Sequence, residues 1–129
     1  MSDTASHYTK SKLNEEVATK IRERIPEELG WYMVVLFYSA LHLVDAYLVT
    51  KAWNPSMENH GERNRELRKC TELTKPFRTA YRSLQDISEQ VRYDPGFLAA
   101  ENHIRQTSDD LKAIKVFLDS KIKRHLEPR

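Results

Sequence analysis

Hydrophobic residues recur along this chain at the three- and four-residue spacing of amphipathic helices, and no alternating run typical of a strand is found. The clearest pattern predicts a helix whose inward positions are Phe77, Ala80, Tyr81, Leu84, Ile87, Ser88 and Val91. A turn signal at residues 93–96 ends it. The last helix is expected over about residues 97–126, with a main stripe formed by Ile104, Leu111, Ile114, Leu118 and Ile122.

The earlier part of the chain predicts three more helices. The first is expected over about residues 10–24, with one apolar stripe made by Leu13, Val17, Ile21 and Ile25. Pro26 breaks it and suits the first turn of a second helix, which runs to about Lys51 and is apolar almost all round. A loop over residues 53–61 then leads to a short third helix over about 62–74, with Leu67, Cys70 and Leu73 inward.

Short connections between long amphipathic helices imply that neighbouring helices are antiparallel. We therefore expect one all-α domain, an up-and-down bundle of four or five helices, with the short third helix inserted in a long crossover. A helix that is apolar all round belongs at the centre of such a bundle. The 129 residues are enough to bury a core without a disulfide or a metal.

The most apolar segment, residues 29–44, contains no Asp, Glu, Lys or Arg. It is shorter than the roughly 20 residues that span a bilayer, and His42 and Asp45 would lie in or beside the apolar zone at a high cost. We therefore expect a buried core helix and no membrane partner.

Charge and cysteine content add little by themselves. The net charge of +2 is too small to argue for nucleic acid, but seven Lys and Arg stand against three Glu between residues 62 and 82. Such a basic segment is typical of a phosphate-facing surface or, more simply, of a solvated helix face. The single cysteine, Cys70, excludes an internal disulfide and suits a reducing cytoplasm, and its helical spacing predicts a buried thiol.

Polar residues in the apolar second helix mark a candidate site. Tyr38, His42 and Asp45 are spaced i, i+4 and i+7, so they share one helix face. The loop, the third helix start and the fourth helix end supply further polar groups. The candidate catalytic residues are His42, His60, Arg63 and Arg92, and the candidate binding residues are Tyr38, Asp45, Asn64 and Tyr93.

Each candidate also has a structural interpretation. A histidine in an apolar helix is commonly a core residue with one hydrogen bond, and Asp45 can simply hold His42 or be solvated at the rim. A metal set of His42, Asp45, Glu58 and His60 has the right donor atoms, but no paired motif such as HExxH accompanies it. We therefore expect no metal and no cofactor.

Four short motifs carry a family resemblance: FYSALHLVDAYL in the second helix, HGERN in the following loop, YRSL, and SEQVRY at the end of the fourth helix. In order and spacing they resemble the HEPN superfamily (higher eukaryotes and prokaryotes nucleotide-binding) over roughly residues 8–118. The resemblance implies a bundle of four or five helices. Many members are metal-independent ribonucleases, often toxins or antiviral effectors that act as dimers, and others are non-catalytic partners of small nucleotidyltransferases or are implicated in nucleotide binding.

The usual ribonuclease motif of the family, Arg followed by His after four to six residues, does not occur in this chain. A variant site would need a base, an acid and a cation for the phosphorane, for which His42, His60 and either Arg63 or Arg92 are the candidates.

Two function hypotheses follow. The first is a nucleic-acid- or nucleotide-directed module, including a divergent ribonuclease, in a defence or toxin–antitoxin setting. The second is a non-enzymatic dimerising partner whose polar cluster is structural. We expect a homodimer, with Trp31, Trp53 and the tyrosines as anchors, and a nucleotidyltransferase or another defence protein as a possible partner.

Overall fold

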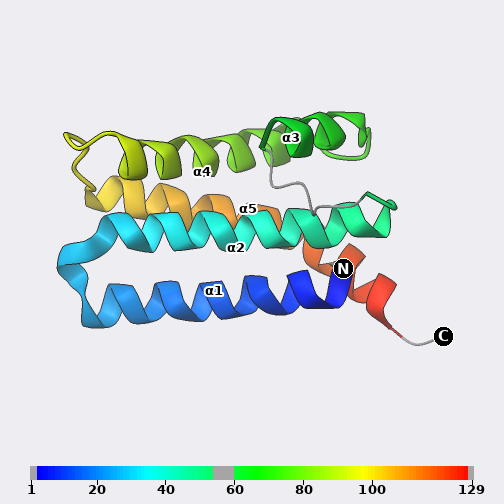
Figure 1. Ribbon diagram of the computed structural model, residues 1–129, viewed down its shortest axis with the longest axis horizontal. Helices are drawn as coiled ribbons and strands as arrows, with labels where there is room; N and C mark the ends of the chain where they lie inside the picture. The colour runs from blue at the N-terminus through cyan, green and yellow to red at the C-terminus, as the bar shows by residue number, and fades with distance from the viewer. Residues whose placement is uncertain (1–2, 54–59, 128–129) are drawn as a thin grey trace.

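The structure is a computed structural model that describes residues 3–53 and 60–127. The described residues form five α-helices and one 3-10 turn, with no strand among them: α1 (Thr4–Arg24), η1 (Pro26–Glu28), α2 (Leu29–Thr50), α3 (His60–Lys69), α4 (Lys75–Tyr93) and α5 (Glu101–Leu126). The four long helices run alternately in opposite directions, and the short α3 lies beside the start of α4 (Figure 1). The predicted all-α up-and-down bundle is therefore confirmed.

Helix α2 lies at the centre of the bundle, as its composition predicts. Fourteen of its 22 residues are buried, and α1, α4 and α5 all pack against it. By length and composition alone, the helical stretch Pro26–Thr50 is long and apolar enough to cross a membrane. It is longer than residues 29–44, the segment that the sequence analysis compared with the thickness of a bilayer. Most of this stretch is nevertheless buried inside the bundle, as is typical of a core helix.

The ends of the helices follow from local chemistry. The Asp3 carboxylate accepts a hydrogen bond from the Ser6 N–H and caps α1, and the Thr74 hydroxyl accepts one from Phe77 N–H and caps α4. After α4, the Asp94 carboxylate accepts a hydrogen bond from Gly96 N–H, which closes the predicted turn. Helix α5 starts at Glu101, with Ala100 as its N-cap, a few residues later than the sequence predicts.

The predicted apolar stripe of α1 is wrong as a core-facing surface. Leu13 and Val17 are 49% and 46% exposed, and Ile25 is exposed too, whereas the buried residues of α1 are Thr4, Ser11 and Ala18. A repeat of four residues drifts by about 40° per step around a helix of 3.6 residues per turn, so the four positions do not share one face. Ile21 alone among the four packs against the core.

Small and polar residues take the place of that stripe. The Ser11 hydroxyl donates to the Ser39 carbonyl at 2.8 Å, and the Ser39 hydroxyl donates to the Ser11 carbonyl at 2.9 Å. One edge of α1 faces α5 through ion pairs, the closest joining Glu15 and Lys115 at 2.8 Å. Hydroxyl groups and charges thus join α1 to its neighbours beside the apolar contacts of Tyr8, Ala18 and Ile21.

The predicted stripes of α4 and α5 are confirmed. In α4, Ile87 and Val91 are partly buried and pack against the core, and the fully inward positions are Phe77, Ala80, Tyr81, Leu84 and Ser88. In α5, the predicted residues are all buried: Ile104, Leu111, Ile114, Leu118 and Ile122. These two helices and α2 together enclose the apolar core.

Candidate functional site

Tyr38, His42 and Asp45 lie on successive turns of one face of α2, and each contacts a different neighbouring helix. The three polar pairs are Arg92 of α4 with Tyr38, His7 of α1 with His42, and Arg63 of α3 with Asp45. The sequence placed the three α2 residues on one face correctly. The three pairs therefore follow one another along α2.

The Asp45–Arg63 pair is buried. Arg63 donates from Nε to Asp45 Oδ1 at 2.7 Å and from Nη2 to Oδ2 at 3.2 Å, and each side chain is only 3% exposed. The guanidinium group also lies over the Trp53 ring, 5.9 Å from its centroid. Because a bidentate pair of this kind fixes both partners, Arg63 docks the start of α3 onto α2.

His42 contacts a histidine that the sequence analysis missed. Its Nδ1 lies 3.0 Å from Nδ1 of His7, and the two rings are stacked with centroids 5.3 Å apart. One of the two nitrogens carries the proton that the other accepts. Burial, with help from the charges of His7, Lys10 and Arg63, lowers the pKa of His42 from 6.5 to about 4, so its ring is neutral at pH 7.

A signal for His7 was present in the sequence. Thr4, His7 and Ser11 are spaced i, i+3 and i+7, which places them on one face of α1. Both flanking residues hydrogen-bond to α2: the Thr4 hydroxyl donates to the Ala46 carbonyl at 3.2 Å, and Ser11 bonds Ser39. A stripe of small polar residues flanking a histidine indicates a polar seam between helices.

Arg92 is held at the end of α4. Its Nη1 donates to the Tyr38 hydroxyl and its Nε to the Ser88 carbonyl, both at 3.2 Å. The guanidinium also lies 5.0 Å from the centroid of the Tyr93 ring, and Tyr93 is largely exposed. Arg92 thus lies between Tyr38 and Tyr93, and Tyr38 is one helical turn from His42.

The remaining two candidates, His60 and Asn64, belong to α3. His60 begins the backbone of α3, but its side chain lies outside the described part of the structure. Glu58, considered as a metal ligand, also lies outside the described residues. Asn64 donates to the side chain of Gln85 at 3.3 Å and lines a cavity between α3 and α4.

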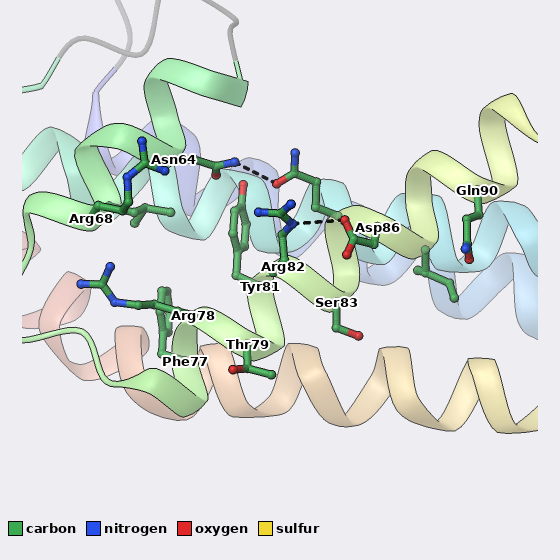
Figure 2. A pocket seen from close by; sticks show the side chains of 13 residues that line it. Asn64, Arg68, Phe77, Arg78, Thr79, Tyr81, Arg82, Ser83, Asp86 and Gln90 are labelled. Atoms are coloured by element: carbon green, nitrogen blue, oxygen red, sulfur yellow. Dashed lines mark hydrogen bonds and ion pairs between the residues drawn. The ribbon is translucent and has the colours of Figure 1, made fainter.

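That cavity has a volume of about 650 Å³ (Figure 2). Its apolar wall is formed by Leu67, Phe77, Tyr81 and Ile87. Its charged residues are Arg68 of α3 and Arg78, Arg82 and Asp86 of α4, so three arginines stand against one aspartate. Basic residues between positions 62 and 82 therefore line one cavity from two helices, α3 and α4.

The three arginines of this cavity differ in how they are held. Arg78 donates to the carbonyls of Leu73 and Cys70 and so caps the end of α3. Arg82 pairs with Asp86 at 3.3 Å on the exposed surface. Arg68 is exposed, and no carboxylate in the described part of the chain lies within 4.0 Å of it.

Tyr81 lies between these arginines in Figure 2. Its side chain is buried, and its hydroxyl has no hydrogen-bond partner among residues 3–53 and 61–127. Burial raises the pKa of this phenol well above its ordinary value of 10, so it stays protonated and can donate a hydrogen bond. The Tyr81 ring thus lines the cavity beside the arginines, while its hydroxyl is buried beneath the surface.

Comparisons with protein-family models, with curated proteins and with solved structures found no match for this chain. The resemblance to the HEPN superfamily therefore stays a prediction from the motifs.

Proposed function

We propose that this chain is an HEPN-like module that binds a nucleotide or a nucleic acid, with a phosphate group of the ligand in the cavity between α3 and α4. The observation that carries the proposal is the charge of that cavity, where Arg68, Arg78 and Arg82 stand against Asp86. Guanidinium groups present planar pairs of N–H donors that match phosphate oxygens, which makes arginine the usual residue at such sites.

The size and lining of the cavity fit a nucleotide unit. A volume of about 650 Å³ lies within the range of small-molecule sites. The side-chain amides of Asn64, Gln85 and Gln90 line it and offer both donors and acceptors to a base edge. The apolar wall beside them suits the faces of a base or a ribose.

We propose binding and not cleavage as the activity. Arg63, a candidate for the phosphorane cation, is buried and donates to both oxygens of Asp45. His42, whose pKa is about 4 because it is buried, is a weak base at neutral pH and cannot donate a proton as an acid there. Arg63 and His42 therefore suit a structural role between helices better than a catalytic role.

The binding experiment uses a fluorescently labelled single-stranded RNA and, separately, a labelled nucleoside triphosphate, with anisotropy measured over a range of salt. Each of Arg68→Gln and Arg82→Gln removes one cation and should weaken binding and reduce the salt dependence by about one phosphate contact. Arg105→Gln, at an exposed position of α5, is the matched control and should change neither the affinity nor the salt dependence. Equal losses in all three variants, or no binding to either probe, would contradict the proposal.

The resemblance also supplies a biological setting. We propose that the chain works in a defence or toxin–antitoxin system, as a homodimer or with a nucleotidyltransferase or another defence protein. Co-purification of the untagged protein with the product of a neighbouring gene tests this directly.

The second candidate function is a non-enzymatic dimerising partner protein. The observation that favours it is the row of internal pairs on α2, since Tyr38, His42 and Asp45 each hold another helix of the same chain. Under this function the cavity between α3 and α4 binds neither probe, so the anisotropy experiment separates the two candidates.

A further inference from the structure

We infer that His7, His42 and Asp45 form a site for a divalent transition-metal ion of the zinc class. Each residue offers one ligand atom, and the three atoms all lie within 4.8 Å of one another. The two nitrogens come from α1 and α2, so the ion would link these helices. This inference does not rest on the nucleotide site proposed between α3 and α4.

The distance between the two histidines fits a shared ion. Imidazole nitrogens bind zinc at about 2.0–2.1 Å, so two of them on one ion lie roughly 2.9–3.4 Å apart at angles between right-angled and tetrahedral. The two Nδ1 atoms of His7 and His42 are 3.0 Å apart. Without metal, a proton lies between these nitrogens; an ion takes its place, both nitrogens become ligands, and the proton passes to water.

Both histidines are held in place by their helices. One turn on either side of His7, hydroxyl groups of α1 bond carbonyls of α2: Thr4 to Ala46 and Ser11 to Ser39. The backbone around His7 is therefore fixed with respect to α2 whether or not an ion is bound. A site built on two such packed helices is rigid, which favours metal affinity.

Asp45 supplies the oxygen ligand and is oriented from outside. Arg63 donates to both of its carboxylate oxygens. A carboxylate oxygen carries more than one lone pair, so a hydrogen bond from Arg63 does not by itself exclude an ion. Hydrogen bonds from neighbouring residues commonly orient ligating carboxylates. Two imidazoles and one carboxylate form a set that suits zinc, cobalt, nickel or copper better than magnesium or calcium, which prefer oxygen alone. Three protein ligands leave a further position of a tetrahedral ion to water or to another group.

The sequence analysis considered His42 and Asp45 together with His60 and Glu58, and expected no metal because no paired ligand motif accompanies them. In the structure, the histidine beside His42 is His7, which lies 35 residues earlier in the chain. The packing of α1 against α2 brings these two residues together, and no short spacing motif in the sequence records that packing.

The test uses the full, tag-free chain, with zinc binding measured by isothermal titration and cobalt binding by its visible absorption. We expect one ion per chain and cobalt bands shaped by nitrogen ligands. His7→Ala and His42→Ala should each weaken zinc binding by at least about tenfold. His125→Ala, which removes an exposed histidine near the end of α5, is the matched control and should leave binding unchanged.

Asp45→Asn is less useful alone, because it also removes the charge that pairs with Arg63. His7→Gln keeps a polar side chain on α1, and circular dichroism establishes whether it folds. Zinc binding unchanged in the folded His7 variants, or reduced equally by His125→Ala, would overturn the inference and indicate adventitious surface binding. Failure of the wild-type chain to bind zinc or cobalt at micromolar concentrations would overturn it as well.

Discussion

Arg63 reaches from the first turn of α3 to α2 and donates hydrogen bonds to both carboxylate oxygens of Asp45, at 2.7 and 3.2 Å. Both side chains are almost fully buried, so neither charge is solvated by water. The pair is therefore a structural joint whose two halves depend on each other.

Asp45→Ala should lower the free energy of unfolding by about 3–5 kcal/mol, because it removes the carboxylate that pairs with the buried Arg63 guanidinium. Urea denaturation measures this loss. The matched control is Asp86→Ala, which breaks the exposed pair with Arg82 and should cost less than about 1 kcal/mol. Losses of similar size in the two variants would show that the Asp45–Arg63 pair contributes no more than a surface pair.

Asp110 of α5 predicts a pH dependence. Burial raises the pKa of its carboxyl above 3.8, and the nearby charge of Asp109 adds to the effect, while contacts with Ser83 and Gln106 oppose it. The folded chain therefore holds the proton more tightly than the unfolded chain does. As the pH rises from 3.8 through the raised pKa, the ionised carboxylate destabilises the fold, and above that pKa the penalty is complete.

Asp110→Asn should therefore stabilise the protein at pH 7, and the gain should shrink towards about pH 4. We expect roughly 1 kcal/mol, the usual cost of a buried polar atom without a partner, because Oδ2 of Asp110 has none among the described residues. Urea denaturation at several pH values tests this. Asp109→Asn, an exposed neighbour with the same change in net charge, should give a smaller gain. A gain that persists undiminished at acid pH would contradict the assignment to Asp110.

Gly30 marks a close approach between α2 and α4. A Cβ atom at this position would lie 3.0 Å from Cγ1 of Val91. Alanine favours helix over glycine by about 1 kcal/mol, but this contact opposes the gain. Gly30→Ala should therefore be more stabilising by roughly 1 kcal/mol in a Val91→Ala background than in the wild-type chain. Purely additive effects in thermal unfolding of the four proteins would rule out the contact.

Trp31, on α2, is 52% exposed and is our choice of anchor for the predicted homodimer, since tryptophan is enriched in interfaces. Light scattering of the wild-type protein at micromolar concentration should report twice the mass of 15.2 kDa. Trp31→Ser should shift the population towards the monomer, whereas Leu98→Ser, at a more exposed position before α5, should not. A wild-type monomer would contradict the prediction.

The sequence predicted the helices whose inward residues are large and apolar. The stripes of α4 and α5 match the buried residues because hydrophobic burial drives their packing. The inward face of α1 was mispredicted because Ser11 and Ala18 face the core there while Leu13 and Val17 face water. Periodicity identifies apolar faces, and it does not recognise a face made of hydroxyls and small side chains.

For the candidate site, the sequence grouped residues within one helix correctly and across helices only in part. The spacing of Tyr38, His42 and Asp45 fixed their common face, because helix geometry depends on local spacing alone. Their pairing with His7 and Arg63 depends on how α1 and α3 pack against α2. That packing cannot be deduced from the spacing of residues in the sequence. For the same reason, the basic segment was visible in the sequence, while the cavity that it lines was not.

The serine contacts between α1 and α2 have a consequence for how the molecule opens. Apart from Tyr8, Ala18 and Ile21, the residues of α1 that face the bundle are polar, so α1 itself buries less apolar surface than the other long helices do. We therefore expect the detachment of α1 to cost less free energy than the rupture of the core formed by α2, α4 and α5. Native-state hydrogen exchange should then reveal α1 as a separate cooperative unit, whose amide protons exchange before those of the other three long helices.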